Sequence, residues 1–489
     1  MSERLLLTTI KGLKWSTISQ VFRQVLQYIS TLILVGILAP DEFGLMAMAV
    51  VLINFLEIFK DFGTGSAMIQ IQNPSHELKS TVYWFNVLVG AVITTIIFLS
   101  APIVSEIYNA PKLEQVLQVL SFVFFITGFS ILQKSLLEKE LIFQNLSIIE
   151  LIASFFSFII VLVLAFNGYG VWSLVFQVLA SALVSSILLI IYSKWKPGIY
   201  FRIKELSKIK RFSLNLVGFN FINFFSRNGD YFLIGKFLGE KELGHYYLAY
   251  KIMLYPLQNI TYVVTRVFFP SLSKIQNDNS KFQKVYKQIT STIAIITFPL
   301  MTGLALISFD FASVFFGSKW DISLIAWLII ILAPVGALQS VYSTSGNIYM
   351  AKGKTDWMFK WGLLYTTITI AGFIVGLKWG VIGVALSYLI TNLLFLYPVF
   401  AIPFKLIDLR FTDFSKTFTR TVLTVLLMCI VTISVNLFLD GFYGSVTKLI
   451  ILIMVGSVSY LIFSRIFNWD KISDLLSIWN QYRNTLNKV

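Results

Sequence analysis

The feature that most constrains this chain is a run of apolar residues that recurs from near the N-terminus to residue 464. A helix of about 20 such residues crosses the hydrocarbon core of a bilayer, so each run predicts a membrane span. Only 13% of the residues are charged, too few to cover a soluble protein of 489 residues. We therefore predict an all-α membrane protein with about fourteen transmembrane helices. The spans are expected at residues 15–38, 43–60, 81–104, 114–133, 148–166, 171–192, 211–235, 244–269, 289–309, 323–348, 358–377, 380–402, 421–439 and 445–464.

The distribution of basic residues gives these spans a direction. When Lys60, Arg211, Lys360 and Lys448 near the span ends are counted with the adjoining segments, 29 of the 39 Lys and Arg residues fall in segments expected inside, 6 in segments expected outside and 4 within spans. This alternation follows the positive-inside rule when the N- and C-termini are both cytoplasmic. One span more or fewer would place every later loop on the opposite side of the membrane and would destroy this alternation of basic residues. The sequence thus predicts a multi-pass protein of the inner (cytoplasmic) membrane, with its least certain turns at residues 40–42 and 378–380.

The net charge of +15 is explained by this topology, so no nucleic-acid partner is expected. The densest basic block, at residues 194–211, is interpreted as an orientation signal and linker in preference to a contact with lipid head groups. Cys429, His76 and His245 are too few and too far apart for a disulfide framework or a metal site. We expect no cofactor and no enzymatic activity, because no P-loop and no Ser/His/Asp cluster is present. The sequence leaves open the alternative of a catalytic site formed entirely by residues within the spans.

Two short blocks indicate an internal repeat. LVGILAPDEFG at residues 34–44 resembles LIGKFLGEKELG at residues 233–244, and each leaves the outer end of a span through a short acidic turn. Because the first and seventh spans point the same way, the pattern predicts two parallel repeats of six helices followed by two more. The predicted parts are an N-terminal six-helix bundle (1–200), a C-terminal six-helix bundle (201–404), and the last two helices with a cytoplasmic tail (405–489).

Polar residues follow helical spacing in three of the spans, so in each span they share one helix face. These spans are the first span of the first repeat and the first two spans of the second repeat. Because the first and seventh spans are equivalent in the repeat, their polar stripes are expected to face each other. The stripes are Ser16, Gln20, Arg23, Gln27 and Ser30 in the first span; Asn220, Asn223, Arg227 and Asp230 in the seventh; Lys251, Gln258, Thr261 and Thr265 in the eighth.

Charged residues inside spans predict a site for an anionic group, such as a phosphate or an acidic sugar. A cation at mid-membrane costs on the order of 3 kcal/mol, so it needs a reason to be there. Arg23 and Lys251 have no opposite charge within four residues and favour this interpretation most. Alternatively, Arg227 and Asp230 neutralise each other, and Arg266 extends to the cytoplasmic surface. The candidates are Arg23, Arg227, Lys251 and Arg266 for binding; Gln20, Gln27, Asn220, Asn223 and Gln258 for lining; and Asp230 and Glu57 for ion coupling.

Several longer motifs carry a resemblance to a known family. They are LAPDEFGLMAMA (38–49), DFGTGSAMIQ (61–70), GYGVWSLV (168–175), GDYFLIGKFLG (229–239), FFPSLSKIQ (268–276) and FPLMTGLAL (298–306). Together they resemble the polysaccharide transporter family of the multidrug/oligosaccharidyl-lipid/polysaccharide (MOP) exporter superfamily, and the most similar branch is the Wzx-like colanic-acid or teichuronic-acid exporter type. The resemblance runs from about residue 10 to residue 400 and is weak over the last two spans.

The resemblance implies a MATE-like pair of six-helix bundles around a cationic cavity. It also implies a bacterial flippase for undecaprenyl-pyrophosphate-linked oligosaccharides, with membrane lipids and other polysaccharide-assembly proteins as partners. Drug-exporting relatives often carry a carboxylate in the first span, which this chain lacks, so the coupling ion stays open. The alternatives are a cation-coupled multidrug exporter, a peptidoglycan-precursor (lipid II) flippase, and a membrane glycosyltransferase, polymerase or ligase.

Overall fold

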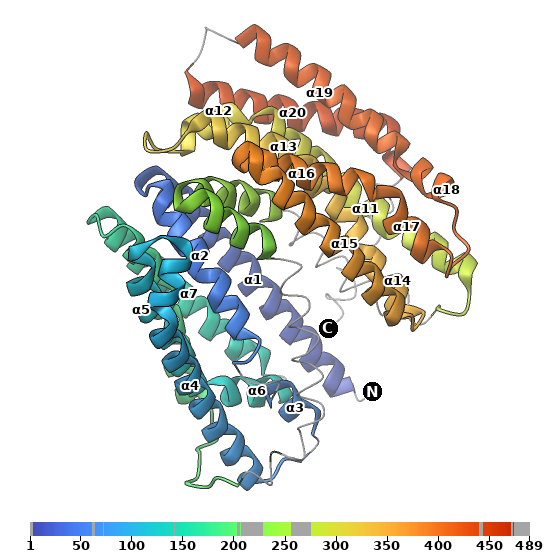
Figure 1. The fold of residues 1–489 in the computed structure, drawn as a ribbon. Helices are drawn as coiled ribbons and strands as arrows, with labels where there is room; N and C mark the ends of the chain where they lie inside the picture. The colour runs from blue at the N-terminus through green and yellow to red at the C-terminus, as the bar shows by residue number, and fades with distance from the viewer. Residues whose placement is uncertain are drawn as a thin grey trace. The chain divides into compact units, whose positions relative to one another are not determined.

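The computed structural model describes residues 3–60, 64–71, 73–140, 142–202, 206, 228–255, 275–439, 444–470 and 473. For residues 3–18, 66, 70 and 355 it describes the backbone alone. All regular secondary structure within these ranges is helical, which confirms the all-α prediction (Figure 1).

The chain divides into two compact units. The N-terminal unit comprises Met1–Gly244 with Gly317–Lys319, and the C-terminal unit comprises His245–Phe316 with Trp320–Val489. The predicted division at residues 200 and 404 stays a prediction. In the N-terminal unit the helices are α1 (Glu3–Ile37), α2 (Pro40–Glu57), α3 (Thr64–Gln70), α4 (His76–Tyr108), α5 (Pro111–Gly128), α6 (Ile131–Lys139), α7 (Phe143–Phe166) and α8 (Val171–Tyr192), with helical residues 228–244.

The C-terminal unit begins with helical residues 245–255 and continues through a series of long helices and short 3-10 turns. Its α-helices are α11 (Asn279–Leu306), α12 (Ser308–Phe315), α13 (Ile322–Tyr342), α14 (Gly346–Ala351), α15 (Thr355–Gly376), α16 (Gly380–Leu394), α17 (Leu396–Phe404), α18 (Phe411–Ser415), α19 (Thr419–Leu439) and α20 (Ser445–Phe467). The 3-10 turns are η1 (Ser343–Ser345), η2 (Leu377–Trp379) and η3 (Lys416–Phe418).

Each predicted span is mostly helical where the structure describes its residues, with breaks at residues 38, 58–60, 129–130, 307 and 395. Within the described residues, nine helical segments are long and apolar enough to cross a membrane, or ten if α5 and α6, bent by 44°, form one span. The total of about fourteen spans stays a prediction. The short turns predicted near residues 40–42 and 378–380 both separate two helices in the structure. Helix α1 ends at Ile37 before α2 begins, and α15 ends at Gly376 before α16 begins.

Local chemistry sets several of these helix boundaries. The Ser75 side chain accepts a hydrogen bond from the Leu78 N–H and caps the first turn of α4, which ends at Asn109 in the left-handed conformation with φ +53°. At α2 the first helical residue is Pro40, whose fixed φ suits that position. The Glu42 carboxylate accepts the Ala39 N–H at 2.7 Å, satisfying one free donor of the turn.

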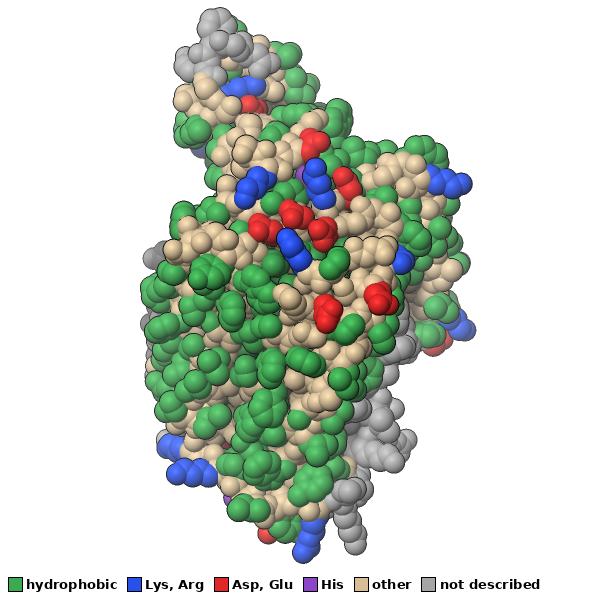
Figure 2. Space-filling view, turned by 60° about the vertical axis from the view of Figure 1, so that its left-hand side comes forward, with side chains coloured by type: hydrophobic (Ala, Val, Ile, Leu, Met, Phe, Trp, Pro, Cys, Tyr) green, Lys and Arg blue, Asp and Glu red, His purple; other side chains and the backbone are tan. Residues whose placement is uncertain are grey.

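The surface of α4 shows why these helices belong in lipid. Large apolar side chains recur along one face, and Leu99 and Ile103 are 70% and 60% exposed. The face drawn in Figure 2 is covered largely by hydrophobic side chains, and most charged side chains gather towards its ends. In water such a surface would cause aggregation, whereas against lipid tails it carries no penalty.

The last two long helices pack on the rest of the C-terminal unit. Antiparallel helices α19 and α20 contact α11 and α12 (Figure 1). The Tyr460 hydroxyl donates to the Ile295 carbonyl at 2.5 Å, and Lys448 Nζ lies 3.5 Å from Asp310 Oδ1 with both side chains only 14% exposed. The appended helices are thus fixed by specific polar contacts as well as by apolar packing.

Candidate substrate-binding site

Arg23 projects from α1 in the N-terminal unit and is paired with a carboxylate. Its Nη2 lies 3.0 Å from Glu150 Oε2 of α7 and donates to Gln20 Oε1 at 2.6 Å. The side chains of Arg23 and Glu150 are 32% and 30% exposed, so solvent or a ligand can reach both. Arg23 has no opposite charge within four residues of the sequence, and its partner in the structure comes from a distant helix.

Glu150 was available to sequence reasoning and was missed there. It lies inside the predicted span 148–166, where a carboxylate is as costly as a cation and calls for a partner. What sequence alone does not give is which helix packs against α7. The structure places α1 along it, and that contact brings Glu150 to Arg23.

The polar stripe of α1 is split between exposed and buried positions. Gln20 and Gln27 are exposed, Arg23 is partly exposed, and Ser30 is 2% exposed. Ser16 lies where only the backbone is described. The accessible stretch of the stripe therefore spans Gln20 to Gln27, with Arg23 as its charge.

Lys251 lies in the C-terminal unit between two tyrosine rings. Its Nζ is 5.5 Å from the centre of the Tyr247 ring and 5.8 Å from that of Tyr255. Spacing of four residues on either side places all three on one helix face. An ammonium over two aromatic rings is stabilised by their negative faces without losing its net charge. Among the described residues, no Asp or Glu forms an ion pair with Lys251.

The two predicted ion-coupling carboxylates have different surroundings. Glu57 is 52% exposed and its Oε1 lies 3.5 Å from Lys60 Nζ, one turn along the chain. Asp230 is 4% exposed and its Oδ1 accepts the Tyr231 N–H at 2.9 Å. The remaining candidates, Arg227, Arg266, Asn220, Asn223 and Gln258, lie outside the described residues.

The repeated turns meet inside the N-terminal unit. A Cβ built on Gly44 would lie 1.7 Å from the Glu240 carbonyl oxygen, and one on Gly244 would lie 1.8 Å from the Pro40 carbonyl oxygen. Gly44 thus faces the backbone at Glu240, four residues before Gly244. Gly244 faces the backbone at Pro40, four residues before Gly44. This reciprocal contact joins equivalent positions of the two repeated blocks and explains why both end in glycine.

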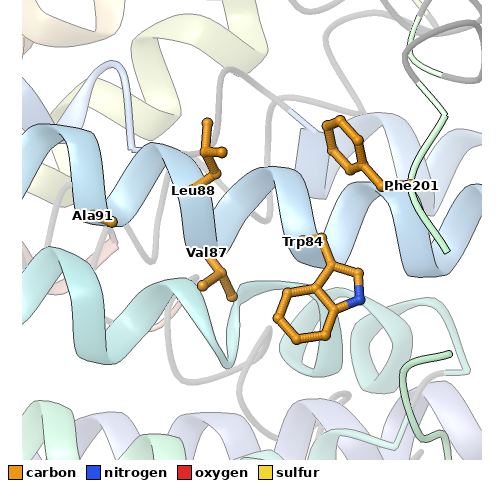
Figure 3. A pocket seen from close by; sticks show the side chains of 5 residues that line it. All are labelled: Trp84, Val87, Leu88, Ala91 and Phe201. Carbon is orange, nitrogen blue, oxygen red and sulfur yellow. The ribbon is translucent and has the colours of Figure 1, made fainter. Parts of the chain in front are cut away.

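An apolar hollow lies beside the start of α4. Trp84, Val87, Leu88 and Ala91 line it together with Phe201, and its volume is about 340 Å³ (Figure 3). The segment that carries Phe201 is held on α4 because the Trp84 indole donates to the Gly198 carbonyl at 2.9 Å. The beginning of the basic block is therefore docked on the helix bundle.

In the described part of the chain, no three His, Cys, Asp or Glu side chains come together. Long apolar helices that carry ionisable side chains are typical of polytopic membrane transporters. Residues 33–325 match the family model described as polysaccharide biosynthesis protein, and the chain belongs to that family. The match confirms the predicted resemblance to polysaccharide transporters and a transporter role in place of an enzymatic one.

Two curated relatives cover most of the chain. The lipopolysaccharide biosynthesis protein WzxC of Escherichia coli (strain K12) is 30% identical over 79% of this chain and 79% of its own length. The teichuronic acid biosynthesis protein TuaB of Bacillus subtilis (strain 168) is 28% identical over 92% and 94%. Among solved structures, the lipid II flippase MurJ in an inward closed conformation has a TM-score of 0.73 at 20% identity, covering 94% of this chain and 99% of that one. The chain is thus a multi-pass membrane protein with a MOP transporter fold.

Proposed function

We propose that this protein flips undecaprenyl-pyrophosphate-linked oligosaccharides from the inner to the outer leaflet of the bacterial cytoplasmic membrane. The observation that carries the proposal is that two cations lie within helices expected to cross the membrane. Arg23 is about one-third exposed beside Glu150, and Lys251 lies against the rings of Tyr247 and Tyr255. The family match and the names of the two relatives support polysaccharide precursors as the cargo.

The chemistry of the cations suits a pyrophosphate. Arg binds phosphate oxygens through paired N–H donors, and Lys acts as a point charge with three donors. Both attractions are stronger in a partly dry site than in water. The sugar is carried with the pyrophosphate through the protein, while the polyprenyl tail stays in lipid.

Movement between leaflets requires alternating access. Transporters built from helical repeats provide it by rocking one repeat against the other, and the reciprocal Gly44–Gly244 contact supports tight packing of the repeated turns in the N-terminal unit. With both termini cytoplasmic, as the basic residues predict, these turns lie at the outer face. An ion gradient is the proposed energy source, without a bound cofactor.

The rival functions differ in the charge they require. A cation-coupled drug exporter needs an anionic site, which Lys251 between two tyrosines does not provide. A lipid II flippase shares the pyrophosphate chemistry and differs in the sugar and peptide. It is therefore the second candidate, supported by the MurJ-like fold.

Deletion of the gene tests the proposal in cells. The lipid-linked oligosaccharide should then accumulate on the inner leaflet, shielded from a sugar-modifying reagent added outside. Accumulation on the outer leaflet would contradict the proposal, because a polymerase or ligase step would then be missing. Unchanged polysaccharide with depleted peptidoglycan would favour the lipid II flippase.

A further inference from the structure

The ion pair between Arg23 and Glu150 has the properties of an exchangeable contact. Its oxygen–nitrogen distance is 3.0 Å, and both side chains are about one-third exposed. In the described structure, Arg23 Nε is buried without a hydrogen-bond partner. Glu150 and Gln20 therefore leave part of the guanidinium unused, and a ligand with several oxygens can offer more acceptors than one carboxylate.

The charges around Glu150 come from two of the helices packed on α7. On α1 there is Arg23. On α6 there are Glu138, whose carboxylate repels that of Glu150, and Lys134, whose Nζ lies 4.0 Å from Glu138. Lys139 of α6 is engaged by the Met68 and Ile71 carbonyls. Helix α8 carries no charged residue at all. Arg23 is thus the cation that balances Glu150.

We propose that Glu150 is a positioning residue that competes with the substrate's pyrophosphate for Arg23. This inference rests on the proposed function and deepens its binding step. In the empty site Glu150 holds Arg23 beside Gln20. When the pyrophosphate binds Arg23, it displaces the Glu150 carboxylate from the guanidinium. The ion pair re-forms when the pyrophosphate departs.

The physical reason for the competition is that both anions need the same donors. A pyrophosphate can pair fully with Arg23 only after the Glu150 carboxylate has given up its contact, so the energy of the ion pair is subtracted from that of binding. Removing the carboxylate therefore strengthens binding of the pyrophosphate lipid.

Glu57, predicted from sequence as a coupling residue, lacks this arrangement. Its ion pair with Lys60 is made within a single helix, at an exposed position. The partner of Glu57 is Lys60, which is not among the predicted binding residues. Glu150 differs because its partner is Arg23 itself.

The test measures binding of undecaprenyl pyrophosphate to the purified full-length protein in lipid nanodiscs at one fixed pH. Glu150→Gln should bind about two- to fivefold more tightly than wild type, the range expected for loss of a partly exposed ion pair. Glu138→Gln, the matched control, should bind like wild type, and Glu150→Asp should restore wild-type affinity. When Arg23 is also replaced by alanine, Glu150→Gln should give no gain in affinity, because the guanidinium for which the two anions compete is absent.

Two results would overturn the inference. One is unchanged affinity in Glu150→Gln, and the other is weaker binding by Glu150→Gln, which would mean that Glu150 only supports the fold. The proposed function fails separately, when wild type neither binds nor flips the lipid. Wild-type binding and flipping with either of the first two results would discard the role of Glu150 alone.

Discussion

Arg23 and Lys251 are both cations within apolar helices, yet the protein stabilises them by different means. Arg23 is neutralised by Glu150 across two helices, whereas Lys251 lies against the rings of Tyr247 and Tyr255. A carboxylate cancels charge and must be displaced before an anion binds. Tyrosine rings leave the charge available. The comparison suggests that Lys251 supplies most of the electrostatic attraction for the anion in the empty site. Arg23 attracts the anion only once Glu150 has been displaced.

Removal of the Lys251 charge should give the largest effect. In Lys251→Met, polysaccharide export should fall about 10- to 100-fold, since a charge-assisted contact contributes roughly 1.5–3 kcal/mol. Protein in the membrane should stay at the wild-type level, because no ion pair is broken. The measurement is surface polysaccharide normalised to membrane protein. Export close to wild type would make Lys251 a structural charge.

A second change tests where the two repeats are alike. Gly44→Ala places a methyl group against the Glu240 carbonyl and should destabilise the protein by about 1–3 kcal/mol, seen as a lower thermal unfolding midpoint. Gly244→Ala should behave the same way because it meets Pro40. Gly303→Ala in α11 is the control, since its added Cβ meets nothing within 4 Å. Equal midpoints for all three variants would refute the close contact.

The Arg23–Glu150 pair predicts non-additive stability. Arg23→Ala leaves Glu150 without its cation and should cost about 1 kcal/mol, a value reduced because both side chains are partly exposed. The double variant Arg23→Ala/Glu150→Ala should regain much of that loss while export stays impaired. A double-mutant cycle on the unfolding midpoint measures the coupling. Additive losses would indicate that the two side chains do not interact.

The smallest effect is expected at Glu57. Its pair with Lys60 spans one helical turn at an exposed site, and such pairs contribute about 0.3–0.5 kcal/mol. Export by Glu57→Gln should therefore stay within about twofold of wild type. A severe transport defect with normal membrane levels would restore Glu57 as a coupling candidate.

Sequence patterns located the helices well and the contacts between helices poorly. Apolar length and a Ser75 cap are local features, so α4 could be placed to within a few residues. The Gly44–Gly244 contact had a visible trace as a repeat, but similarity does not say that two copies touch. The Arg23–Glu150 pair depends on α1 packing on α7, which no spacing within either helix encodes. The contact of Lys251 with Tyr247 and Tyr255 is intermediate in how well the sequence predicts it. The four-residue spacing is visible in the sequence, but it indicates a contact only when aromatic rings are considered as partners of a cation.

The most direct test of the account is leaflet exchange in a defined system. Purified protein would be reconstituted into liposomes with a fluorescent undecaprenyl-pyrophosphate-linked sugar, and an impermeant quencher would report the fraction that changes leaflet over time. The account predicts rapid exchange with wild type and at least about tenfold slower exchange with Lys251→Met. Exchange with wild type no faster than in protein-free liposomes would contradict the flippase assignment, and equal rates for the two proteins would contradict the cation-based mechanism.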